Sequence, residues 1–218
     1  MTTVFSPISP RAARTRSALL AAGLELLAER PVDAIAIDEV VARAGVAKGS
    51  FFNHFTDKSG FAGAVAQHVR LALEQRVGAT NANEGDPVMR LAGGMRVGME
   101  FALEDRVRAI IMLRGLQETT GIDHELNRGV RADIDAAVAA GRLRPEAATS
   151  GVRYWLGLCH VAMLNIIERQ PGPVAAAERL HDMLVLGLCG LGIDEARARE
   201  VAAASAARLR SASAREQD

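Results

Sequence analysis

The sequence predicts an all-α protein with two helical parts. Over most of the 218 residues, apolar side chains recur at intervals of three and four, which is the spacing of one face of a helix. No segment shows the long alternation of apolar and polar residues that marks a half-buried strand. The periodic segments end at helix breakers such as Pro31, Gly45 and Pro87. The length suffices for one small and one larger domain, each with its own core.

A short N-terminal arm, residues 1–10, precedes the first predicted helix. Thr15 or Ser17 is suited to open this helix, and Pro31 ends it. One face between these bounds is apolar, as expected of a helix that packs on its neighbours. The residues of this face are Leu19, Leu20, Gly23, Leu26 and Leu27.

Residues 36–46 predict a second, short helix followed by a sharp turn. Gly45 comes directly after the last periodic residue, where glycine adopts the left-handed conformation that ends a helix without a Cβ penalty. Val46 then anchors the turn in the core. The apolar face of this helix consists of Ile37, Val40, Val41 and Ala44.

Residues 47–54 predict a third helix with one aromatic face and one polar face. Phe51 and Phe55 are four residues apart, so they share the buried face. The open face carries a cation, a hydroxyl, an amide and an imidazole, the groups that contact phosphates and base edges in a major groove. Two helices joined in this way predict a helix-turn-helix. The open-face residues are Lys48, Gly49, Ser50, Asn53 and His54, and Lys58 follows at the start of the next helix.

In these residues the chain resembles the TetR family of bacterial transcriptional regulators. The resemblance rests on Arg16 with the apolar run after it, on residues 40–55, and on Lys58. It implies an N-terminal three-helix DNA-binding domain, residues 1–57, and a larger C-terminal helical domain, residues 58–218, for ligand binding and dimerisation. It also implies that the residues contacting DNA are Lys48, Gly49, Ser50, Phe52, Asn53, His54 and Lys58.

Three positions depart from the family pattern. Phe52 stands where the family usually has tyrosine, so a hydrogen bond from that hydroxyl to phosphate is missing. Ala36 and Ala47 stand where serine or threonine usually caps the two helices, a difference of about 1 kcal/mol per cap. These changes leave the polar surface in place and predict a modest DNA affinity.

From Lys58 the helical pattern continues through Phe61, Val65, Val69 and Leu73 and predicts a long helix. In the family that the chain resembles, this helix links the two domains. The clearest internal break falls at residues 81–87. Further helices are predicted at residues 88–103, 104–115, 118–140, 145–169, 173–191 and 194–209.

Two of the later helices are unusually apolar. The helix around residues 154–167 leaves almost no polar face, and the next helix carries a regular apolar stripe. The resemblance implies that this pair forms a four-helix bundle with a second copy, so that two recognition helices read a palindrome. The alternative is that both helices fill the core of one chain. The residues predicted at the homodimer interface are Leu180, Met183, Leu184, Gly187 and Leu188.

The C-terminal part is also expected to bind a small, mostly apolar effector. Methionines and aromatic residues supply adaptable apolar walls, although each is more often plain core. Polar groups such as His160 and Gln117 would orient the ligand, and a hydrogen-bonded core histidine is the alternative for His160. The predicted ligand-binding residues are Met99, Met112, Arg114, Trp155, Cys159, His160 and Met163.

Composition and motifs argue against other classes. The 26 basic and 26 acidic residues balance, so DNA affinity must come from local cations. Cys159 and Cys189 lie in apolar surroundings and indicate reduced thiols. No catalytic, nucleotide-binding or metal-binding motif is found, so neither an enzyme nor a cofactor nor a metal is expected. Without a secretory signal or an apolar run that spans a bilayer, a cytoplasmic protein is expected.

The sequence therefore predicts a transcriptional regulator, a repressor that binds palindromic double-stranded operator DNA as a dimer and leaves it when an effector binds. The rival hypothesis is an adaptor of the same fold that binds a protein partner and no DNA. Lys48, Asn53, His54 and Lys58 occur together, which an adaptor does not require. A lone exposed histidine or lysine would be interpreted as solvated surface, but the whole constellation favours DNA binding.

Overall fold

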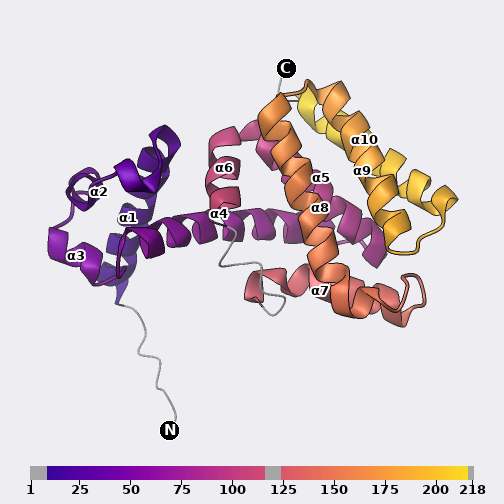
Figure 1. Ribbon diagram of the computed structural model, residues 1–218, viewed down its shortest axis with the longest axis horizontal. Coiled ribbons are helices and arrows are strands. Elements are labelled where there is room, and N and C mark those ends of the chain that lie inside the picture. The colour runs from indigo at the N-terminus through magenta and orange to yellow at the C-terminus, as the bar shows by residue number, and fades with distance from the viewer. Residues whose placement is uncertain (1–8, 116–123, 216–218) are drawn as a thin grey trace, which may run out of the picture.

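The computed structural model describes residues 9–115 and 124–215 (Figure 1). Every regular element in these two stretches is an α-helix or a short 3-10 helix, so the predicted all-α class is confirmed. No helix in the described stretches is long and apolar enough to cross a membrane. The elements are α1 (Pro10–Glu29), η1 (Val32–Ala34), α2 (Ile37–Ala44), α3 (Lys48–Phe52), α4 (Lys58–Asn81), α5 (Pro87–Glu104), α6 (Arg106–Arg114), η3 (Glu125–Asn127), α7 (Arg128–Ala139), α8 (Ala147–Arg169), α9 (Pro173–Gly190) and α10 (Glu195–Arg215).

The first helix begins earlier than predicted. The Ser9 hydroxyl accepts a hydrogen bond from the Ala12 N–H at 3.2 Å, and Pro10 occupies the first turn, where no donor is needed. The predicted start at Thr15 or Ser17 was wrong because the first turns of α1 carry no apolar stripe. Residues 1–8 of the predicted arm lie outside the described residues.

The long helix α4 joins two hydrophobic clusters. Asp57 caps it, since its carboxylate accepts from the Gly60 N–H at 2.8 Å. Phe61 and Val65 pack in the cluster formed with α1, α2 and α3, whereas Leu73 packs in the cluster formed by α5 to α10. Figure 1 shows α4 as a single rod between the two groups of helices. The same helix thus contributes to both hydrophobic clusters.

A second connection between the clusters is made by α6. Ile111 of α6 is buried in the N-terminal cluster, and Met112 next to it is buried in the C-terminal cluster. Gly115 ends α6 in contact with Ala66 of α4. The residues after it, 116–123, which include Gln117 and the predicted start of the next helix, lie outside the described part of the chain.

The C-terminal core surrounds α5, which is buried on nearly every side. Met95, Met99 and Trp155 are among the largest fully buried side chains. Arg96 and Glu100 form an ion pair one turn apart within this helix, and both are almost inaccessible to solvent. Helices α8, α9 and α10 pack along one side of α5 (Figure 1).

The stripe predicted at the dimer interface belongs mainly to the core of one chain. Leu180, Leu184 and Leu188 have no exposed surface, because they pack in the same cluster as residues of α10. Gly187 is also buried, and only Met183 is partly accessible. The assignment of the three leucines to a dimer interface was therefore wrong, and of the two alternatives the structure favours monomer core. The apolar residues that α8 and α9 expose are Tyr154, Val161, Leu164, Val174 and Leu186.

Candidate DNA-binding surface and ligand cavity

The turn between α2 and α3 has the geometry that the sequence predicts. Gly45 adopts a left-handed conformation with φ of 66°, and the Val46 N–H donates to the Val41 carbonyl at 3.0 Å. These bonds satisfy the carbonyls at the end of α2. Ala36 and Ala47 precede the two helices and supply no side-chain cap. The predicted loss of both capping hydroxyls is therefore present in the structure.

An aromatic cluster fixes the orientation of α3. Phe51 is fully buried, and its ring centroid lies 5.4 Å from that of Phe55 and 5.3 Å from that of Phe61 on α4. The Arg16 guanidinium of α1 lies 5.8 Å from the centroid of the Phe55 ring, within the range of a cation–π contact. The short third helix is thereby held against both α1 and α4, although its regular part, Lys48–Phe52, is shorter than predicted.

The opposite side of α3 is open. Lys48, Gly49 and Asn53 are exposed, and Ser50 and His54 are half-buried. Phe52 is 53% exposed, an unusual position for a phenylalanine that is not covered by a partner. The structure therefore brings the predicted DNA-contacting residues of this helix to one open face.

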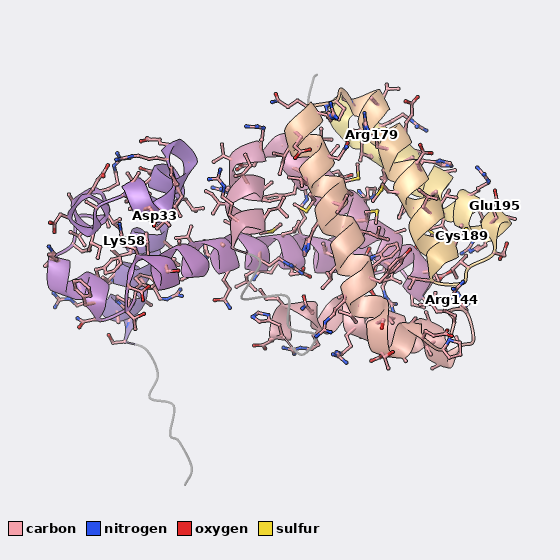
Figure 2. The ribbon with its side chains drawn as sticks, viewed as in Figure 1. Asp33, Lys58, Arg144, Arg179, Cys189 and Glu195 are labelled. Atoms are coloured by element: carbon pink, nitrogen blue, oxygen red, sulfur yellow. The ribbon has the colours of Figure 1, made fainter. Side chains whose placement is uncertain are left out.

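Two predicted DNA contacts have partners within the chain. Lys48 forms an exposed ion pair with Asp38 of α2, with 2.8 Å between the ammonium and the carboxylate. Lys58 donates to the carbonyls of Asp33 and Ile35, at 3.1 and 3.2 Å. Figure 2 labels Lys58 and Asp33 in the N-terminal group of helices. These two bonds fasten the segment between α1 and α2 to the start of α4. Lys58 thus has a structural role that its predicted phosphate contact did not include.

A cavity of about 310 Å³ lies among α4, α5, α6, α7 and α8. Its walls are mostly apolar and include five of the predicted ligand-binding residues. Two others lie elsewhere: Met99 is packed in the core, and Arg114 is exposed beside separate grooves on α6. The predicted residues that do line the cavity are Met112, Trp155, Cys159, His160 and Met163.

The cavity also contains two ion pairs that the sequence analysis missed. Arg70 of α4 is 4% exposed and donates to Glu74 of the same helix at 2.6 Å and to Asn127 at 3.2 Å. Arg90 of α5 donates to Asp133 of α7 at 2.6 Å. The sequence carries a signal for the pair of Arg70 and Glu74. These residues are four apart and lie beside the apolar stripe of α4, a spacing at which opposite charges meet on a helix.

Burial keeps two residues of α8, Cys159 and His160, uncharged. Burial, assisted by the positive charge of Arg70, lowers the pKa of His160 to about 4. Burial also raises the pKa of the Cys159 thiol to about 12. At neutral pH the imidazole therefore offers one donor and one acceptor, and the thiol is not a reactive thiolate.

Residues 19–65 of this chain match the family model for bacterial regulatory proteins of the tetR family. They span the C-terminal half of α1, the helix-turn-helix and the start of α4. This segment belongs to the TetR family. Its resemblance in sequence is thereby confirmed for the part that carries the open face of α3.

Two curated transcriptional regulators are similar to part of this chain. The transcriptional repressor DhaR of Mycobacterium sp. (strain GP1) is 35% identical over 75 residues, 34% of this chain and 38% of DhaR. The transcriptional regulator AcuR of Cereibacter sphaeroides is 38% identical over 53 residues, 24% of either chain. The matched region thus covers well under half of either relative.

Solved structures resemble this chain over the whole fold. RolR in complex with resorcinol has a TM-score of 0.65 at 23% identity, covering 88% of this chain and 94% of RolR. A regulator assigned to the tetR family from Shewanella sp. PV-4 has a TM-score of 0.71 at 15% identity, covering 83% of this chain and 99% of the other. A gamma-butyrolactone receptor has a TM-score of 0.55 at 21% identity, covering 92% and 98%. At these identities the likeness concerns the fold.

Proposed function

We propose that this TetR-family protein is a DNA-binding transcriptional regulator, a repressor released from its operator by a small molecule. The observation that carries the proposal is the path of α4. Its first residue, Lys58, is bonded to the segment before α2, and further along the same helix Arg70 and Glu74 line the cavity. An occupant of the cavity therefore contacts the helix that supports the recognition helix.

The DNA contact is proposed for the open face of α3. The helix is held by buried aromatic residues, with Lys48 and Asn53 exposed and Ser50 half-buried beside them. This face suits a major groove, in which cations contact phosphates and amides contact base edges. Residues 1–57 would form the DNA-binding domain and residues 58–218 the effector-binding and dimerisation domain. The curated relatives DhaR and AcuR, a named repressor and a named regulator, are similar to part of this chain and support the proposal.

A homodimer is proposed through the exposed side of α8 and α9. Leu186 is 70% exposed and Val161 57% exposed, and monomers seldom leave several such residues together without a partner. Two-fold symmetry would place two copies of α3 on one face, which suits a palindromic operator. This surface replaces the buried leucine stripe of α9 as the interface.

Release by an effector requires that the ligand bind one arrangement of α4 better than the other. The free energy that couples two sites in this way is typically about 1–3 kcal/mol. RolR, which shares the fold, binds resorcinol, and a gamma-butyrolactone receptor shares it as well, so a small, mostly apolar effector suits this cavity.

The experiment is a footprint of the purified protein on the DNA upstream of its own gene, at about 0.1 M salt because phosphate contacts weaken at higher ionic strength. A protected palindrome is expected. Absence of protection there and on a pool of random duplexes would contradict the proposal and favour the adaptor. The variant Asn53→Ala should relax the sequence preference, and Glu195→Gln, on the surface of α10, serves as the control.

A further inference from the structure

The charges that line the cavity cancel in pairs. Arg70 is bonded to Glu74, and Arg90 to Asp133, each at 2.6 Å. Arg70 and Asp133 are largely buried, so neither pair is screened strongly by water. An ionised ligand would enter without an unpaired counter-charge and would lose its hydration. The cavity therefore disfavours anions and cations alike.

His160 supplies hydrogen-bonding capacity without charge. Its ring is largely buried, yet it has no hydrogen-bond partner among the described residues. In those residues the fully buried side-chain polar atoms without a partner are Arg96 Nε and Asn165 Oδ1, and the His160 nitrogens are not among them. The ring nitrogens of His160 are consequently accessible from the cavity or from the groove on its other side, which Val161 and Leu164 line. A neutral imidazole can donate to or accept from a hydroxyl group.

Glu74 offers an acceptor on α4 itself. Its carboxylate receives a bond from Arg70 and still has free lone pairs, and about a quarter of its side chain is accessible. The volume of about 310 Å³ corresponds to roughly ten to fifteen non-hydrogen atoms, since one water molecule takes about 30 Å³ in the liquid. An occupant of that size reaches both His160 on α8 and Glu74 on α4.

We propose that the effector is an uncharged molecule of this size that carries at least one hydroxyl group, and that Glu74 is the residue through which its hydroxyl acts on α4. This inference rests on the proposed function only in assigning the cavity as the effector site. Glu74 is a positioning residue for Arg70. A hydroxyl that donates to a free lone pair of Glu74 shares this carboxylate with Arg70 and adds a contact between the ligand and α4.

The test compares alcohols with carboxylates of matched shape on the full-length protein. The probes are 2-naphthol against 2-naphthoate, by calorimetry, and 1-decanol against decanoate, by emission of Trp155. Trp155 is the single tryptophan of the chain and lines the cavity, so its emission reports directly on occupancy. At least one alcohol is expected to bind at least tenfold more tightly than its carboxylate. Equal or tighter binding of both carboxylates, or binding of neither alcohol, overturns the proposal.

Two variants test which residues cause the preference for alcohols over carboxylates. Glu74→Gln leaves the Arg70 guanidinium without an anionic partner, so carboxylate binding should improve at least tenfold and the preference for alcohols should reverse. His160→Phe should weaken alcohol binding about tenfold with little effect on the carboxylates. The matched controls are Glu195→Gln, which breaks an exposed pair of the same spacing at 2.6 Å, and His181→Phe on α9. Unchanged selectivity in Glu74→Gln would contradict the role of Glu74.

The outcomes separate this inference from the proposed function. Probe binding is measured without DNA, and the footprint is measured without probes. A protected operator together with a preference for carboxylates would leave the regulator in place and overturn the ligand class. Binding of alcohols without any footprint would support the ligand class and contradict DNA binding.

Discussion

Gly115, the residue that ends α6, lies directly against Ala66 of α4, with no room between them for another carbon atom. A Cβ added at Gly115 would overlap the Cβ of Ala66. This contact fixes the separation of the two helices that connect the hydrophobic clusters. The close packing of α6 on α4 therefore depends on a glycine at this position.

Replacing Gly115 by alanine should force α6 and α4 apart. Overpacking of this kind costs about 1–3 kcal/mol, and we expect that loss in the free energy of unfolding measured by urea denaturation. We also expect altered DNA affinity, because α4 carries the recognition helix. Gly78→Ala is the control, since a Cβ there meets nothing within 4 Å and alanine favours a helix. Equal effects of the two variants on stability would contradict the tight contact.

Replacing Lys58 by methionine should destabilise the N-terminal helices. The change removes two bonds to the carbonyls of Asp33 and Ile35, each worth about 1 kcal/mol. If this structural role dominates, DNA binding weakens while the slope of its salt dependence stays the same. Lys48→Met should instead lower the magnitude of that slope by about one, as expected on loss of a phosphate contact. A similar reduction of the slope in Lys58→Met would show that Lys58 contacts a phosphate.

The helix-turn-helix could be predicted from sequence because its determinants are local. Gly45 ends α2 as expected, and the spacing of Phe51 and Phe55 identifies the buried side of α3. The bonds of Lys58 could not be predicted in this way. Its acceptors are backbone carbonyls more than twenty residues earlier, and no side-chain pattern marks a carbonyl that lacks a partner.

The cavity was predicted only in part because α5, one of the helices that line it, lacks a clear polar face. α5 is buried on nearly every side, so apolar spacing does not tell which of its residues, such as Met99, face the cavity. The stripe of Leu180 and Leu184 has the same ambiguity, since an apolar helix face suits a monomer core and a dimer interface equally. The pairing of Arg90 with Asp133 joins α5 to α7 and depends on tertiary packing.

Replacing Asp38 by asparagine should strengthen DNA binding. In the free protein the Asp38 carboxylate is 2.8 Å from the Lys48 ammonium, so a phosphate must displace it. Because the pair is exposed, the gain should be small, about two- to fivefold in Kd at low salt and less at high salt. Glu25→Gln is the control, as Glu25 pairs with Arg43 at 2.9 Å instead. Weaker binding in Asp38→Asn would show that Asp38 supports the DNA contact.

Replacing Leu186 by glutamate should separate the proposed dimer without unfolding the chain. The side chain is 70% exposed in the single chain, so a charge there costs little until a second copy covers it. Light scattering should report a dimer for the wild type and a monomer for the variant, with unchanged helical content. Leu71→Glu on α4, at a leucine that is 44% exposed, should remain dimeric. A dimeric Leu186→Glu would place the interface elsewhere.

The burial of His160 makes stability depend on pH in a defined window. Burial and Arg70 lower its pKa from 6.5 to about 4, so between these values the unfolded chain binds a proton that the folded chain does not. The free energy of unfolding therefore falls as the pH falls through this window, by at most about 3 kcal/mol, and this contribution is complete above about pH 7. Urea denaturation at several pH values should show that the free energy of unfolding of His160→Gln falls less than that of the wild type over this pH window. His181→Gln, which removes a half-buried imidazole outside the cavity, serves as the control. Identical pH dependence in all three proteins would mean that His160 accepts its proton in the folded state as readily as in the unfolded chain.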